Sequence, residues 1–283
     1  MRFLLGSISI VLLLVTALLG NLVQMLSLLF YPISKKLVRK INTLVVYLWW
    51  SLCDICATNL CGIEVVITGD HLPTPEQALI IANHQEMPDI LVILHLARQQ
   101  GSIANVKWFA KYPLKFIPGI GWGMLFLDCL FVKRNWNSDK ENILKVFSRY
   151  REERIPFWLV SFLEGTRAKP AKILKSQEYA RKNGLSPLKH VMLPRSKGFA
   201  ATLEGLSGLY DAVYDLTIGY EDRVPTLGSY FYSNVRRVHL HVRRFSSASL
   251  PAGDKERNEW VMQRFKEKDQ LLEIFYRSGR FGA

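Results

Sequence analysis

The chain has 283 residues with 37 Lys+Arg against 24 Asp+Glu, a formal net charge of +13, and 49% of its residues are hydrophobic while 22% are charged. This hydrophobic fraction excludes a disordered or histone-like chain, and four cysteines in a chain of this length exclude a small disulfide-rich domain. The length allows one or two domains at about 150 residues each.

The first element expected is a membrane helix. Residues 3–34 contain no charged side chain, and most of them are Leu, Ile, Val, Met or Phe. A helix of ~20 apolar residues spans a bilayer core, whereas the apolar part of a cleaved signal peptide has only ~7–15 residues before a site of small residues. The sequence therefore predicts an uncleaved membrane helix over about residues 3–31.

A second apolar helix is expected over about residues 41–61. Polar side chains recur along it at helical spacing, namely Tyr47, Ser51, Asp54 and Thr58. Such a narrow polar stripe is typical of a helix that lies in the membrane interface or packs on the first helix. Residues 1–62 are thus predicted to form a membrane anchor, and residues 63–283 one catalytic domain.

A basic cluster between the two apolar stretches predicts the orientation. It consists of Lys35, Lys36, Arg39 and Lys40. Basic residues beside a membrane helix remain on the cytosolic side, so an integral membrane protein with a cytosolic catalytic part is expected, in the endoplasmic reticulum if eukaryotic or the inner membrane if bacterial. A second helix that also spans the bilayer would return the rest of the chain to the far side, so the topology stays open.

The cysteines allow two interpretations. Three of the four, Cys53, Cys56 and Cys61, have a spacing like half of a metal site, and the fourth is Cys129. Because no matching His or Cys cluster lies near this apolar stretch, small packing side chains are the favoured interpretation. The sequence predicts neither a metal site nor an oxidised framework.

From residue 63 onward, short apolar runs alternate with longer stretches of helical periodicity. Strands are expected at 63–68, 78–82, 106–109, 130–132, 157–161, 212–220 and 235–243. Helices are expected at 89–98, 139–154, 176–183, 199–209 and 254–277. This alternation predicts one α/β domain on a mixed, largely parallel sheet flanked by helices.

A candidate general base follows the expected strand 78–82. Turns at strand ends are where α/β proteins place ligands and reactive groups. Pro88 suits the first helical position, which puts Asp89 in the first turn of the next helix. Asp89 could then accept the Nδ1 proton of His84 and leave Nε2 as a base, although a structural His/Asp pair gives the same spacing.

Three further segments are candidates for binding anions. Lys111 opens a segment rich in aromatic residues and glycine that could line an apolar channel. After the strand at 157–161 come Glu164, Gly165, Thr166 and Arg167, in which glycine permits close backbone approach and arginine suits a phosphate. A surface turn with an ion pair between Glu164 and Arg167 is the bland alternative.

The third segment is basic. Residues 167–197 contain nine basic residues and one acidic residue, and the run ends in a rigid turn that bears Arg195 and Lys197. Such an excess of charge is usually a solvated face, but here it could also bring Arg195 or Lys197 beside an anionic group. The sequence contains no dinucleotide, P-loop, HExxH or EF-hand pattern.

Taken in order, four blocks resemble those of the glycerolipid acyltransferases. They are Asn83-His84-x4-Asp89, Lys111 with Pro118-x-x-Gly121-Trp122, Phe162-x-Glu164-Gly165-Thr166-Arg167, and Leu193-Pro194-Arg195-Ser196-Lys197-Gly198-Phe199. The Lys133-Arg134-Asn135-Trp136 corner and residues 177–199 resemble the 1-acylglycerol-3-phosphate and related lysophospholipid acyltransferases of eukaryotic type. The resemblance covers about residues 63–220.

The resemblance implies transfer of a fatty acyl group from acyl-CoA to the free sn-2 hydroxyl of lysophosphatidic acid. His84 would be the base and Asp89 its partner. The substrate would be held by Lys111, Glu164, Gly165, Thr166, Arg167, Arg195 and Lys197. No cofactor beyond acyl-CoA as co-substrate is expected, and the expected partners are membrane lipids, the acyl donor and the lysophospholipid. The insert Gln85-Glu86-Met87-Pro88 departs from the family pattern, and its Glu86 leaves the preferred head group open.

Other functions stay open. An acyltransferase for another lysophospholipid, such as lysophosphatidylinositol or lysocardiolipin, is the nearest alternative. A non-enzymatic, membrane-tethered protein that binds anionic lipid is the alternative of another class. A nucleic-acid binder is disfavoured because aromatic residues are not interleaved with the basic run.

Overall fold

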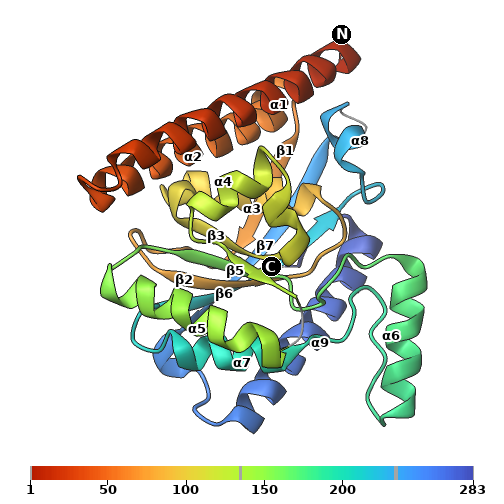
Figure 1. The fold of residues 1–283 in the computed structure, drawn as a ribbon. Helices are drawn as coiled ribbons and strands as arrows, with labels where there is room; N and C mark the ends of the chain where they lie inside the picture. Colours follow the sequence, from red (N-terminus) through yellow and green to blue (C-terminus); the bar gives the residue numbers. More distant parts are fainter. Residues whose placement is uncertain (1, 134–135, 233–234, 283) are drawn as a thin grey trace. The chain divides into compact units, whose positions relative to one another are not determined.

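The computed structural model describes residues 2–133, 136–232 and 235–282 (Figure 1), so residues 134–135 of the corner noted above lie outside the described part. The chain forms two compact units. Unit 1 consists of residues 1–63, 93–160 and 228–234, and unit 2 of residues 64–92, 161–227 and 235–283.

Unit 1 begins with two long helices that lie side by side, α1 (Arg2–Ser27) and α2 (Lys35–Ile55) (Figure 1). A short 3₁₀ turn, η1 (Leu28–Phe30), follows α1, and a π-helical turn, η2 (Cys56–Leu60), follows α2. Both helices are long and apolar enough to cross a membrane. The two predicted apolar helices are therefore confirmed, although α2 begins earlier than predicted because the Ser34 hydroxyl caps it by accepting the Leu37 amide at 3.2 Å.

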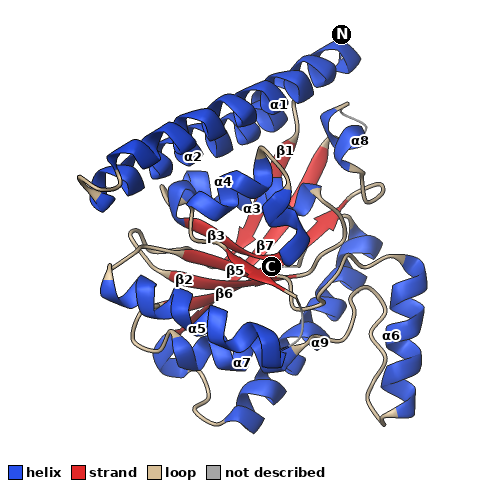
Figure 2. Cartoon of the chain, viewed as in Figure 1, coloured by secondary structure: helices blue, strands red, loops and turns tan. Residues whose placement is uncertain are grey.

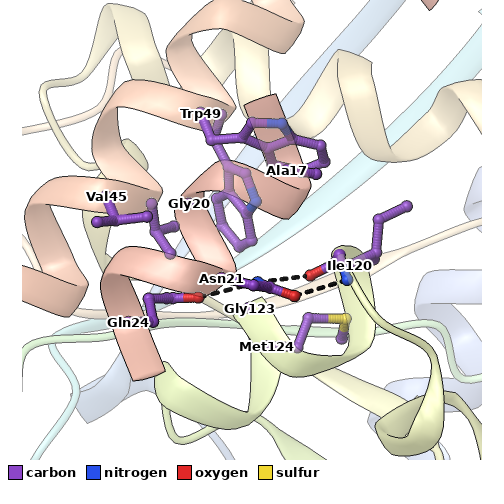
Figure 3. A pocket seen from close by; sticks show the side chains of 12 residues that line it. Ala17, Gly20, Asn21, Gln24, Val45, Trp49, Ile120, Gly123 and Met124 are labelled. Carbon is purple, nitrogen blue, oxygen red and sulfur yellow. Dashed lines mark hydrogen bonds between the residues drawn. The ribbon is translucent and has the colours of Figure 1, made fainter. Parts of the chain in front are cut away.

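Polar groups fasten α1 inside unit 1. The Trp49 indole of α2 donates to the Leu13 carbonyl of α1 at 3.0 Å. The Asn21 side chain makes two hydrogen bonds to Gly119, accepting from its amide at 2.6 Å and donating to its carbonyl at 3.0 Å (Figure 3). Gly119 has a φ of +83° and precedes the short helix α4 (Ile120–Phe126). A cavity of about 20 Å³ remains between these helices (Figure 3).

The predicted polar stripe on α2 does not form one exposed face. Tyr47 is exposed, whereas Ser51 and Asp54 are buried. The Asp54 carboxylate, which is 1% exposed, accepts from His95 Nδ1 at 2.8 Å and from the Arg98 guanidinium at 3.0 Å. The expectation that α2 packs on α1 is confirmed, but its acidic residue serves an ion pair inside unit 1 rather than a wet surface.

The strands of unit 1 pair in parallel. The strand β3 (Val106–Lys111) lies between β4 (Leu130–Val132) and β5 (Trp158–Ser161). The remaining helical elements that lie wholly or partly in unit 1 are α3 (Pro88–Gln99), η3 (Ile103–Asn105), η4 (Tyr112–Phe116), α5 (Trp136–Glu152) and α8 (Leu227–Phe231). The helix α3 starts in unit 2 and ends in unit 1.

Unit 2 contains four strands in the order β1 (Glu64–Gly69), β7 (Arg237–Ser246), β6 (Ala212–Tyr220) and β2 (Ala78–Ala82). Only the β6–β7 pair is antiparallel among the described pairs. Every residue of β2 and β6 is buried, so these strands form the core of the unit. Its helical elements also include α6 (Pro170–Lys182), α7 (Ser196–Gly205), η5 (Ser247–Ser249) and α9 (Asp254–Ser278).

The predicted fold class is confirmed: each predicted strand is present, and the strand pairs are largely parallel with helices between them (Figure 2). The sequence did not predict α4 and α8, which are short. It also placed the start of α6 six residues late, because the basic run around Pro170 hides the apolar periodicity, and proline suits the first helical position.

Candidate active site

The His84 turn is tied to the neighbouring strand of unit 2. It connects β2 to α3, which begins at Pro88 as predicted. The buried Asn83 side chain accepts the Ile218 amide at 2.8 Å and donates to the Ile218 carbonyl at 3.0 Å. Because Ile218 belongs to β6, these two hydrogen bonds continue the pairing of β2 with β6 one residue beyond the end of β2. They therefore fix the backbone position of Asn83, which directly precedes His84.

The structure brings His84 and Asp89 together. His84 Nδ1 lies 2.9 Å from Asp89 Oδ2. An ionised carboxylate can only accept, so this contact places the imidazole proton on Nδ1 and the free electron pair on Nε2. Nε2 has no hydrogen-bond partner among the residues that the structure describes. The ring stacks on Phe162 with centroids 4.0 Å apart, and the side chain is 13% exposed. The imidazole is thus oriented by its surroundings and open to a ligand.

Asp89 is held by donors on both oxygens. Oδ2 also accepts the Gln85 amide at 2.7 Å and the Glu86 amide at 2.9 Å, while Oδ1 accepts the Tyr220 hydroxyl at 2.7 Å. The side chain is fully buried, and four donors compensate for its lost hydration. Asp89 therefore has one orientation, the one that faces His84.

The Glu164 side chain holds the backbone of His84 in place. Its carboxyl accepts the His84 amide at 2.7 Å and the Met192 amide at 3.0 Å, and the residue is 3% exposed. Burial raises the pKa of Glu164 to about 8, outweighing the two amide donors that lower it. No ion pair between Glu164 and Arg167 is found among the described residues, so the bland alternative of a local surface pair is wrong. Contact between Glu164 and a substrate stays a prediction.

Gly165 and Arg195 come together across two loops. Gly165 has a φ of +70°, and a Cβ built on it would lie 3.1 Å from Arg195 Nε. The Arg195 amide donates to the Leu163 carbonyl at 2.8 Å, which joins the start of α7 to the loop after β5. Glycine is needed here for both the left-handed backbone and the arginine that lies against it.

Arg167 pairs with a residue that the sequence left unassigned. Its guanidinium and the Lys169 ammonium both contact the carboxylate of Glu86, which is 6% exposed. Burial raises the pKa of Glu86, but the contacts with Lys169 and Arg167 outweigh burial and lower it below its ordinary value. Glu86 is therefore ionised, and it lies against the cation expected to bind phosphate.

Thr166, Lys197 and Lys111 are the remaining predicted substrate residues. The Thr166 hydroxyl accepts from Lys172 at 2.5 Å. Lys197 lies exposed in the first turn of α7, in unit 2 with the rest of the loop residues. Lys111 ends β3 in unit 1 and is exposed. The binding roles of these residues stay predictions.

Sequence reasoning missed Tyr220, Lys169 and the position of Glu86 between two cations. Tyr220 is the last residue of β6 and lies 131 positions from Asp89, so no local pattern links them. Lys169 was counted only as one charge of the basic run. For the ion pairs of Glu86 with Arg167 and Lys169, the one available signal was the presence of a carboxylate inside the insert between His84 and Asp89.

Known proteins match both parts of the chain. The family model described as Acyltransferase matches residues 64–220, and that described as Acyltransferase C-terminus matches residues 229–283. A probable 1-acyl-sn-glycerol-3-phosphate acyltransferase 5 of Arabidopsis thaliana is 37% identical over 82% of this chain and 62% of its own. The 1-acyl-sn-glycerol-3-phosphate acyltransferase gamma of Homo sapiens is 32% identical over 94% and 72%. Lysocardiolipin acyltransferase 1 of Danio rerio is 34% identical over 84% and 62%.

One solved structure is similar over the whole chain. It is the crystal structure of the 1-acyl-sn-glycerophosphate acyltransferase PlsC from Thermotoga maritima, with a TM-score of 0.61, 18% identity and full coverage of both chains. This likeness shows the fold. This chain spans about 62% of the length of the Arabidopsis relative. The resemblance inferred from the four blocks is confirmed, and the chain belongs to the acyltransferase family that includes 1-acyl-sn-glycerol-3-phosphate acyltransferases.

Proposed function

We propose that the protein transfers a fatty acyl group from acyl-CoA to the free sn-2 hydroxyl of lysophosphatidic acid and so makes phosphatidic acid. The observation that carries the proposal is the oriented pair in which Asp89 holds His84 Nδ1 at 2.9 Å and Nε2 has no partner among the described residues. The names of the relatives support the acceptor class.

The proposed reaction needs one base. His84 Nε2 takes the proton from the acceptor hydroxyl, and the alkoxide attacks the carbonyl carbon of the thioester. The tetrahedral intermediate expels the CoA thiolate as the C–S bond breaks, and the imidazolium returns its proton to that sulfur. Asp89 stabilises the imidazolium while it exists. The proposed chemistry calls for no metal or other cofactor, because base, nucleophile and leaving group are all supplied by His84 and the two substrates.

The acceptor's phosphate is proposed to lie at the loop after β5. Arg167 and Arg195 carry guanidinium groups suited to phosphate, and the Arg195 side chain packs over Gly165. Thr166, Lys197 and Lys111 are proposed as further contacts. These groups fix the acceptor, and the rate gain from such positioning is large when the hydroxyl lies within reach of the base.

We place the reaction at a membrane. The helices α1 and α2 are long and apolar enough to span it. A catalytic part on the cytosolic side, in the endoplasmic reticulum of a eukaryote or the inner membrane of a bacterium, is proposed from the basic cluster between them, with α2 not returning the chain across the bilayer. Cysteine labelling from either side of sealed vesicles at an exposed position of unit 2 tests this orientation.

The decisive experiment is an acceptor panel. The purified full-length protein is mixed with labelled oleoyl-CoA and, separately, with lysophosphatidic acid, lysophosphatidylinositol and lysocardiolipin. Formation of phosphatidic acid at the highest kcat/KM is expected. Product from only lysophosphatidylinositol or lysocardiolipin would overturn the proposed acceptor in favour of the alternative that the zebrafish relative makes reasonable.

Tyr220→Phe is expected to lower kcat about tenfold with little change in the KM of the acceptor. The substitution removes the hydroxyl that donates to Asp89 Oδ1 at 2.7 Å, and a hydrogen bond to a charged group contributes roughly 1.5–3 kcal/mol. Steady-state kinetics check it, with Tyr210→Phe as the matched control because, within the described part of the chain, the one hydrogen bond of its hydroxyl is the long one to the Leu203 carbonyl at 3.5 Å. Equal kcat in the two variants would argue against a positioning role for Tyr220.

A further inference from the structure

The Glu86 carboxylate is fixed inside the proposed acceptor site. It contacts Arg167 and Lys169, and its Oε1 accepts the Met87 amide at 3.1 Å. Its backbone is fixed too, because the Glu86 amide donates to Asp89. With 6% of the side chain exposed, this carboxylate is part of the site rather than a solvated surface group.

The cations around it are less buried. The side chains of Arg167 and Lys169 are 44% and 47% exposed. No other carboxylate pairs with either cation among the residues that the structure describes. The three groups together therefore carry one net positive charge, where the two cations alone would carry two. Part of the donor capacity of Arg167 and Lys169 stays available to a ligand, since each group has several N–H donors.

The charge of a lysophospholipid depends on its head group. A phosphomonoester such as lysophosphatidic acid carries roughly −1.5 to −2 at pH 7, whereas a phosphodiester carries a single charge. Glu86 lowers the positive charge beside the phosphate by one, and this loss weakens the attraction for the second charge of the monoester, which a phosphodiester lacks. The field of Glu86 acts directly on that second charge because the carboxylate lies against the same two cations.

We propose that Glu86 sets the charge preference of the acceptor site, lowering its preference for a phosphomonoester relative to a phosphodiester lysophospholipid. This inference rests on the proposed function, in which Arg167 faces the acceptor's phosphate. Glu86 acts on specificity and takes no part in proton transfer. The protein then acylates phosphodiester acceptors in addition to lysophosphatidic acid, with the balance held by one side chain of the insert between His84 and Asp89.

Two variants of opposite charge test it. Glu86→Gln removes the negative charge and keeps the shape, and Lys169→Gln removes one positive charge. The ratio of kcat/KM for lysophosphatidic acid to that for lysophosphatidylglycerol of the same acyl chain is measured in each. Glu86→Gln is expected to raise the ratio about tenfold, chiefly through a lower KM for lysophosphatidic acid, and Lys169→Gln to lower it by a similar factor. Glu86→Asp keeps the charge and is the matched control. Its ratio of the two kcat/KM values is expected to stay within about twofold of the wild-type ratio.

A purely structural role for the cluster gives a different pattern. Damage to the loop would lower kcat/KM for both acceptors in both variants and leave their ratio unchanged. An unchanged ratio, or a shift in the same direction in both variants, overturns the inference. The melting temperature of each variant identifies a loss of folding, and a misfolded Glu86→Gln leaves the decision to Lys169→Gln.

A binding measurement separates this inference from the proposed function. In the His84→Ala background, the affinity for each lysolipid is measured by tryptophan fluorescence, which needs no turnover. A wild type that acylates none of the acceptors would overturn the proposed function, while the affinity ratio would still be expected to rise with Glu86→Gln. Normal acylation with an affinity ratio indifferent to both variants would overturn the role of Glu86 alone.

Discussion

His84→Ala is expected to lower kcat by about 10²–10⁴-fold with little change in the KM of either substrate, because it removes the proposed base while the loop that holds the acceptor remains. The fold should persist, since Asp89 keeps three of its donors, two from backbone amides and one from Tyr220. Transfer of labelled oleate from its CoA ester, followed in steady state, checks the result. His71→Ala is the matched control because His71 lies exposed in the loop after β1. Full activity in His84→Ala would sink the mechanism.

Asp89→Asn addresses the same pair from the other side. A loss of at least about a hundredfold in kcat is expected because the amide cannot hold the imidazolium as the carboxylate does. The alternative of a non-enzymatic protein that binds anionic lipid predicts something different. Binding to liposomes would then decrease as the salt concentration rises, and Asp89→Asn would leave that binding unchanged. The two outcomes distinguish the enzyme from the alternative of another class.

Lys268→Met is expected to lower the melting temperature by about 10 °C. The Lys268 ammonium on α9 contacts the Asp215 carboxylate on β6 and donates to the Leu216 carbonyl at 2.6 Å, and both charged side chains are fully buried. Removing one partner of a buried ion pair costs about 3–5 kcal/mol because the other charge is left without compensation, and each kcal/mol shifts the midpoint by ~2–4 °C in a chain of this size. Arg243 also pairs with Asp215 at 2.5 Å. The Asp215 carboxylate therefore keeps one cationic partner in Lys268→Met, and the loss of unfolding free energy is not expected to exceed this range.

Thermal unfolding in one detergent, followed by circular dichroism, measures this loss. Lys266→Met removes the same charge from the same helix at an exposed position and is expected to change the midpoint by no more than about 2 °C. A midpoint for Lys268→Met equal to that of Lys266→Met would show that the buried pair does not stabilise unit 2.

Local patterns were enough to predict the strands and the contact between His84 and Asp89. The five apolar residues of β2 run directly into the turn, and Pro88 fixes the start of α3, so the spacing from His84 to Asp89 is determined by neighbours in sequence. The glycerolipid acyltransferase resemblance rests on four such local blocks. Short helices such as α4 were missed because seven residues give too little periodicity to recognise.

Contacts between distant residues could not be predicted in the same way. The polar stripe of α2 was read correctly as helical, but the burial of Asp54 depends on His95 and Arg98, which follow 41 and 44 positions later. Likewise the ion pairs of Glu86 are made with Arg167 and Lys169, which follow 81 and 83 positions later. Charge patterns in one segment do not reveal partners that only the folded chain brings near.

The burial of Asp54 has a consequence for any attempt to produce the protein without its two apolar helices. His95 and Arg98 share its carboxylate, and Trp50 of the same helix lies against Trp108 of β3, with ring centroids 6.0 Å apart. A protease cut or a deletion that removes α2 would leave His95 and Arg98 without the carboxylate that they share. It would also expose the indole of Trp108 in the core of unit 1. The second helix therefore stabilises unit 1, and a more water-soluble version calls for polar substitutions on the exposed face of α2 rather than for its deletion.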